Sequence, residues 1–555
     1  MSNVLLLLLW CAIALALRLV WLTSQPPWTD ECATIVFSLG NSFLGVPLDR
    51  VISTSALMQP FVPDPEAGVG DVVRHLMSES THPPVYFILS HWWLQLFPTT
   101  SEGWVSVWGA RSLSALFGVL AVPAIYGCSW LAFRSRSMAQ FAAALMAVSP
   151  FGIFLAREAR HYTLAILLVI ASLCCFIVAI RAIRSDERFP VWLAIAWIFV
   201  NAIGISTHYF FALNLGAQFL VLLAFWLAEL VPSGGRTPFA PTSISWKSIY
   251  LAILGTLVSG LVWVPIWKTI ADSRLTQWVS DGDVAGIGAI GRLFVWIATM
   301  LFVLPTDNSI LPISVVIVCG IILGVAFIGT IAIAYRGWQY NKRDRQHQVI
   351  LHSLGGYIVA TLALFLTVTY GFGNDITLAP RFCFVCFPTI ILLFSACLAS
   401  DWKRDRHKII AIFGLSFLGA ITVLFNSSYM QHERADALAK YIHDSSNGPV
   451  LIATTHKHHG QTGRMMALAW QLDRLDETRS PQFLLAHKPL PGEAETNPGQ
   501  LLLDVVDNIP RPIYIWTVNF HAPVFVNDRP GCDKDKRERP DLSSYRYRGY
   551  YCEPE

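Results

Sequence analysis

Charged residues are scarce in this 555-residue chain. Asp, Glu, Lys and Arg make up 14% of it, where soluble proteins carry about 25%. Hydrophobic residues make up 54%, a balance that excludes an ordinary soluble globular protein. The formal net charge of +3 is too small to indicate a nucleic-acid-binding surface, so we predict no nucleic-acid partner. The chain shows no internal repeat. No basic residue precedes its first apolar run, so we expect that run to be a retained helix rather than a cleaved signal.

The chain has 11 cysteines, and most of them lie in apolar runs, where a thiol packs as a small hydrophobic group. Cys383 and Cys386 form a CxxC motif at the start of such a run. No second cysteine pair lies beside it, which favours core packing over metal or redox chemistry. Cys532 and Cys552 lie instead in a polar C-terminal tail. If that tail is exported, these two are candidates for a disulfide.

Apolar runs dominate the first 425 residues. A membrane-spanning helix needs about 20 apolar residues. The runs that fit are 4–22, 105–132, 138–155, 162–182, 189–206, 209–231, 247–267, 312–334, 349–370, 381–399 and 408–425. We therefore predict eleven transmembrane helices. Two shorter runs, 83–97 and 290–304, reach only about 22 Å as helices, so we expect them to lie at the membrane interface or to dip into it.

Basic residues predict the orientation of these helices. With eleven spans and an inside N-terminus, the basic clusters all fall on the inner side, as the positive-inside rule requires. They lie around Arg134, Arg181, Arg236, Arg336 and Lys403. The same parity places two long loops, 23–104 and 268–311, and the C-terminal tail on the outer face. We thus expect a multi-pass protein of the inner (plasma) membrane with its active site on the extracytoplasmic side.

The composition changes after residue 425. Residues 449–454, 482–486 and 513–518 have the character of strands and alternate with helical segments, a pattern typical of an α/β domain. The sequence therefore predicts a transmembrane domain over 1–425 and a small soluble α/β domain over 426–555 on the outer face.

Ionisable and aromatic residues gather where the predicted helices meet the outer side. Asp30 and Glu31 follow the first span, and an ionisable residue at the membrane is by default a functional-site hypothesis. The other members of the group are His82, Arg111, Arg157, Glu158, Arg160, Tyr162, His208, Tyr209 and Arg381. Each alone has a structural explanation, such as a snorkelling arginine or an interfacial aromatic belt. Together they place carboxylates beside several guanidinium and imidazole groups on one membrane face.

This combination of groups fits sugar transfer from a lipid phosphate. Guanidinium groups match the oxygens of phosphate, and a carboxylate can take the proton of an acceptor hydroxyl. Fixed positive charge would stabilise the leaving phosphate. The alternative is a transporter or lipid flippase, which also places charges among its helices. A third interpretation is a non-catalytic scaffold that presents the C-terminal domain.

Five stretches carry a family resemblance. They are Trp28-Thr29-Asp30-Glu31, His82-Pro83-Pro84, the segment around Arg111, Arg157-Glu158-Ala159-Arg160-His161-Tyr162 and Pro380-Arg381-Phe382. On these stretches residues 1–425 resemble the polyprenyl-phosphate-dependent glycosyltransferases of the GT-C architecture, in the branch of protein O-mannosyltransferases and aminoarabinose transferases. The resemblance implies an inverting enzyme with Asp30 as catalytic base, Glu31 orienting the site and Arg111 in the phosphate or active-site network.

The chain departs from that family at two places. His82 stands where some relatives have a phosphate-facing lysine, and histidine is a weaker, pH-dependent cation. Residues 426–555 do not match the β-trefoil of the eukaryotic O-mannosyltransferases, which argues against assigning a protein acceptor by analogy. The expected partners are a polyprenyl-phosphate-linked sugar donor, the lipid bilayer and an acceptor that is a glycan, a lipid or a protein.

No metal site is predicted, and assistance by a divalent cation is left open. His456 and His459, which follow a predicted strand, lack a spaced third metal ligand, so we expect a solvated loop there. Residues 534–539 are expected to form a solvated turn, with contact to anionic headgroups or to the acceptor as the alternative.

Overall fold

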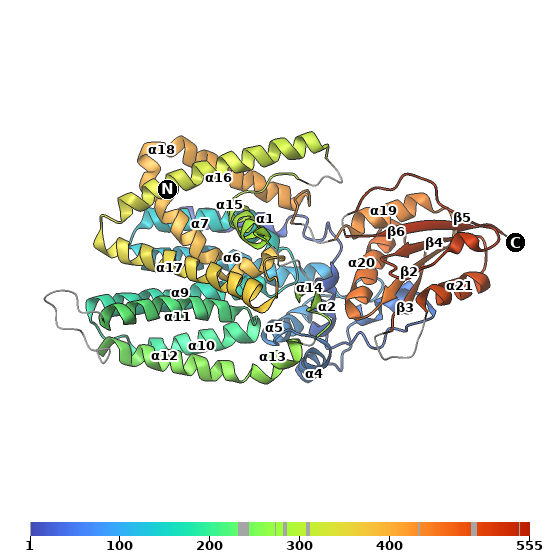
Figure 1. The fold of residues 1–555 in the computed structure, drawn as a ribbon, viewed down its shortest axis with the longest axis horizontal. Coiled ribbons are helices and arrows are strands. Elements are labelled where there is room, and N and C mark those ends of the chain that lie inside the picture. Colours follow the sequence, from blue (N-terminus) through green and yellow to red (C-terminus); the bar gives the residue numbers. More distant parts are fainter. Residues whose placement is uncertain are drawn as a thin grey trace.

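Long helices and one small sheet form two adjoining parts of the molecule (Figure 1). The computed structural model describes residues 2–230, 244–271, 273–280, 286–306, 311–430, 433–489, 497–542 and 544–554. The helical part contains the N-terminus, and the sheet lies at the other end of the molecule, beside the C-terminus. The predicted fold class, a polytopic helical membrane protein with a small α/β part, is confirmed.

The main apolar helices follow the hydrophobic runs of the sequence. They are α1 (Asn3–Leu19), α6 (Val107–Phe133), α7 (Arg136–Val148), α8 (Pro150–Ala156), α9 (Tyr162–Ser185), α10 (Val191–Thr207), α11 (Phe211–Leu230), α12 (Ile244–Leu261), α13 (Val264–Ala271), α15 (Gly288–Leu301), α16 (Ile313–Asn341), α17 (Arg345–Leu366) and α18 (Phe387–Leu424). Among the described residues, six helices are long and apolar enough to cross a membrane, or seven if the bent pair α7–α8 is one span.

This test gives fewer spans than the eleven that the sequence predicts. Three helices at predicted spans, α1, α10 and α12, are apolar but fall short in described length. The last two predicted spans, 381–399 and 408–425, lie mostly in α18, whose backbone leaves helical geometry at Asp405; the first residues of 381–399 belong to the short 3-10 helix Pro380–Val385. The inner loop expected there is therefore a kink.

The first outer loop, 23–104, is folded rather than extended. It contains α2 (Thr29–Ser38), β1 (Val51–Ser53), α3 (Thr54–Met58), α4 (Val69–Glu79) and α5 (Val85–Leu94). α5 occupies the shorter apolar run at 83–97, and α15 occupies the one at 290–304.

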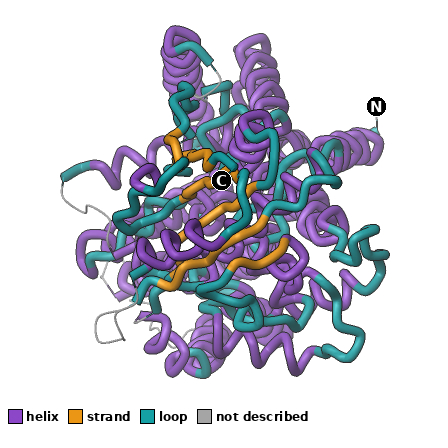
Figure 2. The backbone as a smooth tube through the Cα atoms, turned by 90° about the vertical axis from the view of Figure 1, so that its right-hand side faces the viewer, coloured by secondary structure: helices purple, strands orange, loops and turns teal. Residues whose placement is uncertain are grey.

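The sheet joins this loop to the C-terminal segment. Its order is β1-β3-β2-β4-β6-β5, with β2 (Val450–His456), β3 (Gln482–His487), β4 (Ile513–Val518), β5 (Cys532–Lys534) and β6 (Tyr547–Cys552). β3, β2 and β4 are parallel, whereas β1 pairs antiparallel with β3, with Ile52 opposite Phe483. The sequence predicts an α/β domain made of residues 426–555. In the structure the edge strand of its sheet, β1, comes from the first loop instead. In Figure 2 the strands lie on the viewer's side of the helical bundle.

Helices cover both faces of the sheet. α19 (Ala435–Ser445) and α20 (His459–Leu475) pack with the first loop on one face, where Ile452 and Phe483 are buried. α21 (Pro498–Asn508) packs on the other face with Leu451 and Leu484. The face under α20 is the one turned toward the helical part, since the same buried cluster includes residues of α2.

The cysteines divide as predicted. Cys532 and Cys552 form a disulfide between the paired strands β5 and β6. Cys383 and Cys386 are only 2% and 1% exposed in the helical core, which agrees with a packing role. Most of the residues in the turn at 534–539 are exposed, as expected.

Close packing of α2 against α20 positions the functional site. A side chain at Gly463 of α20 would place its Cβ 3.2 Å from the Thr29 carbonyl and 3.3 Å from the Cys32 Cβ. Glycine therefore lets α20 approach the first turn of α2. Glu433, before α19, completes the junction, because its carboxylate accepts a 2.6 Å hydrogen bond from the Thr29 hydroxyl and lies 3.1 Å from Arg464.

Candidate active site

A cavity of about 530 Å³ lies where the helical part meets α20. Of the residues proposed from the sequence, seven line it: Asp30, His82, Arg160, Tyr162, His208, Tyr209 and Arg381. Sequence reasoning did not place several other lining residues there, among them Trp267, Trp278, Val279, His458, His459 and Gly460.

Asp30 lies between two guanidinium groups in this cavity. Its carboxylate is 3.5 Å from Arg160 Nη2 and 3.5 Å from Arg381 Nη2. Charge-assisted hydrogen bonds are usually shorter, at about 2.7–2.9 Å. The side chain is 31% exposed. Asp30 is therefore a loosely paired carboxylate with access to the cavity, the arrangement that a proton acceptor needs.

Both guanidinium groups are held in place by their surroundings. Arg160 is 1% exposed and donates hydrogen bonds to the Asp30 carbonyl at 3.0 Å and to the Thr34 hydroxyl at 2.7 Å. Arg381 lies over the rings of Trp28 and Trp278, at 5.1 and 5.7 Å from their centroids. Cation–π contacts of this kind fix a guanidinium group without using its N–H donors. Among the described residues, the buried Nε atoms of both arginines have no hydrogen-bond partner.

His82 is not the pH-dependent cation that the family resemblance implies near neutral pH. Burial and the neighbouring Arg160 guanidinium lower the pKa of His82 to about 3, so the imidazole is neutral near pH 7. Its Nε2 lies 3.0 Å from Arg160 Nη2, which can only donate, and its Nδ1 lies 3.2 Å from the Ser80 hydroxyl. His82 therefore orients Arg160 instead of replacing a lysine charge.

Glu31 and Arg111 form a buried pair behind the cavity. Arg111 Nε and Nη2 donate to the two carboxylate oxygens of Glu31 at 2.8 and 2.7 Å. Arg111 also donates to the carbonyls of Leu22, Gln25 and Pro26. The guanidinium is thus fully used in holding the chain between α1 and α2. Arg111 does not line the Asp30 cavity, and its expected place in the phosphate or active-site network stays a prediction.

Arg157 and Glu158 also lie outside the Asp30 cavity, and their part in substrate binding stays a prediction. Arg157 donates to the carbonyls of Val20 and Trp21, at 2.7 and 2.8 Å. The last carbonyls of a helix lack partners within it, so Arg157 caps the end of α1. With Glu158 it lines a separate cavity of about 80 Å³ beside Glu31 and Arg111.

Aromatic side chains form the cavity wall at the ends of α9 and α10. His208 accepts a 3.0 Å hydrogen bond from the Phe210 backbone N–H. Tyr162 lies under Arg160, 5.7 Å from ring centroid to guanidinium. The buried hydroxyl of Tyr209 has no hydrogen-bond partner among the described residues.

The C-terminal segment contributes histidines to this cavity. His458 and His459 lie at the start of α20, and His459 stacks on Phe43 with a 4.9 Å centroid separation. The expectation of a solvated loop is wrong here, because packing of α20 on α2 covers the segment. Within the described ranges, no group of three or more His, Cys, Asp and Glu side chains could hold a metal ion.

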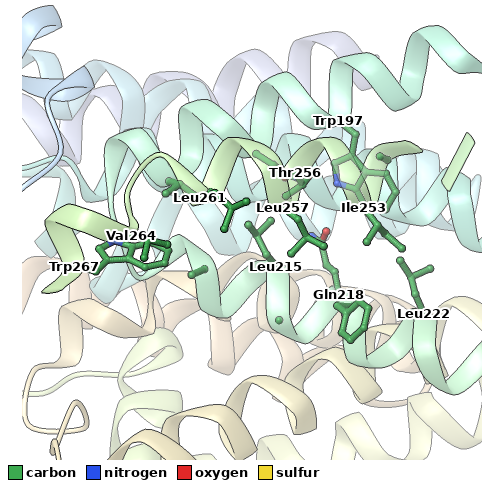
Figure 3. Close-up of a pocket in the computed structure, with 17 residues that line it drawn as sticks. Trp197, Leu215, Gln218, Leu222, Ile253, Thr256, Leu257, Leu261, Val264 and Trp267 are labelled. Carbon is green, nitrogen blue, oxygen red and sulfur yellow. The ribbon is translucent and has the colours of Figure 1, made fainter. Parts of the chain in front are cut away.

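A second, apolar cavity adjoins the first. It encloses about 400 Å³ between α10, α11 and α12 (Figure 3). Its lining is mostly hydrophobic and includes Leu215, Leu222 and Leu257. Ala212 and Trp267 line both cavities. We call this second cavity the apolar groove; uniform hydrophobicity along its helices gave no sign of it in the sequence.

The likeness of this chain to known proteins lies in structure only. No protein-family model and no curated protein matches the sequence. ArnT from Cupriavidus metallidurans is similar in two structures, each matching over 92% of both chains. The form bound to undecaprenyl phosphate has a TM-score of 0.49 at 11% identity, and the apo form 0.47 at 12%. The apo oligosaccharyltransferase of Archaeoglobus fulgidus has a TM-score of 0.44 at 11% identity, over 93% of this chain and 69% of that one. Because these TM-scores are below 0.5 and the identities are 11–12%, we infer the function from this chain's own cavity.

Proposed function

We propose that this protein transfers a sugar from a polyprenyl phosphate to an extracytoplasmic acceptor hydroxyl, with inversion at the anomeric carbon. The observation that carries the proposal is that the Asp30 cavity and the apolar groove share a wall at Ala212 and Trp267. A ligand that fits both must have a polar, anionic head and a long hydrocarbon tail. A sugar linked to a polyprenyl phosphate has this construction.

The head of such a donor has defined partners. Arg381 and Arg160 supply two fixed cations with unused Nε–H donors, and the Tyr209 hydroxyl is also unpartnered among the described residues. Planar guanidinium donors match phosphate oxygens. Because these groups are already held in place, they stabilise the charge on the leaving phosphate without reorganisation.

Asp30 supplies the base in this proposal. It takes the proton of the acceptor hydroxyl while the acceptor oxygen bonds to the anomeric carbon. The bond between that carbon and the phosphate oxygen breaks, and the polyprenyl phosphate leaves with the electron pair toward Arg160 and Arg381. Attack from the side opposite the leaving phosphate inverts the anomeric centre.

The sidedness of the reaction follows from charge. Among the described residues, the basic clusters around Arg134, Arg181, Arg336 and Lys403 lie away from the Asp30 end of the helices and predict that this end is extracytoplasmic, at the plasma membrane. The cluster around Arg236 falls outside the described residues. The product is then a glycosylated component of the cell envelope, either a glycolipid, a polysaccharide or a protein. A hexosyl or a pentosyl group fits a cavity of about 530 Å³.

The test separates glycosyl transfer from lipid transport. The envelope glycans and glycolipids of a deletion strain and its complemented strain are compared by mass spectrometry, which identifies the missing sugar and its carrier. The purified full-length protein is then given that polyprenyl-phosphate sugar and the carrier that lacks the sugar in the deletion strain, in nanodiscs without an ion gradient. We expect release of free polyprenyl phosphate. Intact donor that merely changes leaflet in vesicles would overturn the proposal in favour of a flippase.

A further inference from the structure

A third cavity lies at the end of the sheet remote from Asp30. It encloses about 520 Å³ between β4, β6 and the segment 533–537, and we call it the sheet-end cavity. Val450 at the start of β2 pairs with Tyr514 of this cavity. β2 ends at His456, close to the Asp30 cavity, six positions and about 20 Å farther along the strand. The C-terminus, which follows β6, lies at the end of the molecule farthest from the helical part (Figure 1). The sheet-end cavity is therefore separate from the Asp30 cavity.

Aromatic rings form the floor of the sheet-end cavity. Tyr514 and Tyr551 lie opposite each other on β4 and β6, with ring centroids 4.7 Å apart. Trp516 lies on the same face of β4, and a Cβ at its partner Gly549 would come within 2.8 Å of the indole ring. Glycine therefore lets the indole lie across β6. Trp516 is buried, whereas Tyr514 and Tyr551 are half-buried and line the cavity.

The end of α19 sets one boundary of this floor. Tyr441 of α19 packs edge-on against Trp516, with centroids 5.7 Å apart, and the helix ends at Ser445. Arg537 donates a 2.7 Å hydrogen bond to the Ser445 carbonyl and pairs with Asp535 at 2.9 Å. These contacts hold the segment 533–537 as a wall beside the aromatic floor.

The disulfide fixes the other end of this wall. Cys532 and Cys552 join β5 to β6, and the next pair along the ladder places Asp533 opposite Tyr551. Asp533 therefore lies on the same face of the sheet as the two tyrosines, because directly paired residues share a face. The disulfide keeps a carboxylate at the edge of the aromatic floor.

The wall carries charges of both signs. Asp535 and Arg537 pair with each other. Asp533, Lys534 and Lys536 have no ion-pair partner among the described residues. A ligand with a strong charge of one sign would meet a like charge here. The hydroxyls of an uncharged ligand can instead donate to a carboxylate and accept from an ammonium group.

We propose that the sheet-end cavity is a second, non-catalytic site that binds the sugar rings of a glycan. The faces of a sugar ring carry C–H groups, which pack on the negative faces of aromatic rings, and its edges carry hydroxyls that suit the wall. A volume of about 520 Å³ lies within the range of small-molecule sites. The sidedness given under the proposed function makes this ligand a glycan of the cell envelope. The site keeps the protein on that glycan and takes no part in the chemistry at Asp30.

The test measures oligosaccharide binding by the full-length protein in nanodiscs, because alkyl glycoside detergents would compete for the site. The probes are maltotetraose, cellotetraose and chitotetraose, each titrated by isothermal calorimetry. Tyr551→Ala removes one ring of the floor, Tyr551→Phe keeps the ring, and Asp533→Ala removes an acceptor from the wall. Phe525→Ala is the matched control, because Phe525 is an exposed aromatic residue of the C-terminal segment that does not line this cavity. The unfolding temperature of each variant checks that the sheet is intact.

We expect the wild-type protein to bind at least one probe. Tyr551→Ala and Asp533→Ala should each raise its Kd by about tenfold, the equivalent of one ring contact or one hydrogen bond. Tyr551→Phe and Phe525→Ala should leave the Kd nearly unchanged. Binding of none of the probes, an unchanged Kd in Tyr551→Ala or an equal rise in Phe525→Ala would each overturn the inference. Release of polyprenyl phosphate, measured on the same nanodiscs, reports separately on the proposed function: release without oligosaccharide binding overturns this inference alone, and binding without release refutes only the proposed function.

Discussion

Asp30 and Glu31 are neighbours in the first turn of α2, yet their surroundings are opposite. Glu31 is 1% exposed and binds Arg111 through both oxygens at 2.7 and 2.8 Å. Asp30 is 31% exposed and lies 3.5 Å from each of two guanidinium groups. Consecutive residues of a helix point about 100° apart, so one carboxylate enters the protein and the other the cavity. The comparison assigns anchoring to Glu31 and chemistry to Asp30.

The largest expected effect comes from Asp30→Asn. The amide keeps the size of the side chain but cannot accept a proton, so the transfer rate should fall by about 10²- to 10⁴-fold. The thermal unfolding temperature and the affinity for the donor should change little. Glu66→Gln, which removes an exposed carboxylate from the same loop, is the matched control. Wild-type turnover in Asp30→Asn would remove Asp30 from the base role.

Glu31→Gln and Arg111→Met should act on stability instead. Removing one member of a buried ion pair leaves the other without compensation and costs about 3–5 kcal/mol. We therefore expect each single variant to unfold at a clearly lower temperature in detergent. The double variant should be more stable than the sum of the two losses allows, which a double-mutant cycle measures. Additive losses would mean that the two side chains do not depend on each other.

Arg381 and Arg157, which the sequence analysis proposes together as substrate-binding residues, should differ in their effect on the affinity for the donor lipid. Arg381→Ala removes a cavity cation, and a hydrogen bond to a charged group is worth about 1.5–3 kcal/mol, so the Kd for polyprenyl phosphate should rise by about 10- to 100-fold. Arg157→Ala removes a cap of α1 on the far side of Glu31 and should leave this Kd unchanged. Titration of each purified variant with polyprenyl phosphate gives the comparison. Equal losses would place the phosphate outside the Asp30 cavity.

Most of the fold could be predicted from the sequence, because membrane helices and alternating strands and helices can be recognised from local residue composition. The sequence analysis missed β1, a strand of three residues that pairs with β3 more than 400 residues away. A strand that short gives no period of its own. The predicted sheet therefore lacked the link to the first loop that brings α20 over α2.

The candidate site was predictable in residue type but not in grouping. Arg157 and Arg160 are three positions apart at the end of α8, and either could bind a carbonyl, a carboxylate or a phosphate. Only the path of α1, whose last carbonyls reach Arg157, decides between them. His459 belongs to a different part of the chain, so nothing near Asp30 in the sequence indicates that the two line one cavity.

A smaller expected effect is a difference in how stability depends on pH between the Asp30 side of α2 and its Glu31 side. Burial lowers the pKa of His82 to about 3 and that of His459 to about 4, against about 6.5 in an unfolded chain. The folded protein therefore binds fewer protons than the unfolded one below pH 6.5. The stability that these neutral rings contribute is complete above pH 6.5 and falls toward pH 4, by about 1.4 kcal/mol per pH unit for each histidine.

No histidine is among the described hydrogen-bond partners of Glu31 and Arg111, so acid should weaken the Asp30 side of α2 first. The measurement is the unfolding temperature between pH 7.5 and 5. His82→Gln should flatten this slope by the share of one histidine, whereas the double variant Glu31→Gln/Arg111→Met, which removes both charges of the pair, should shift the curve without changing its slope. A slope that survives in His82→Gln and in His459→Phe alike would show that other groups carry the acid sensitivity. The rings lining the cavity would then be hydrated enough to take up protons in the folded state.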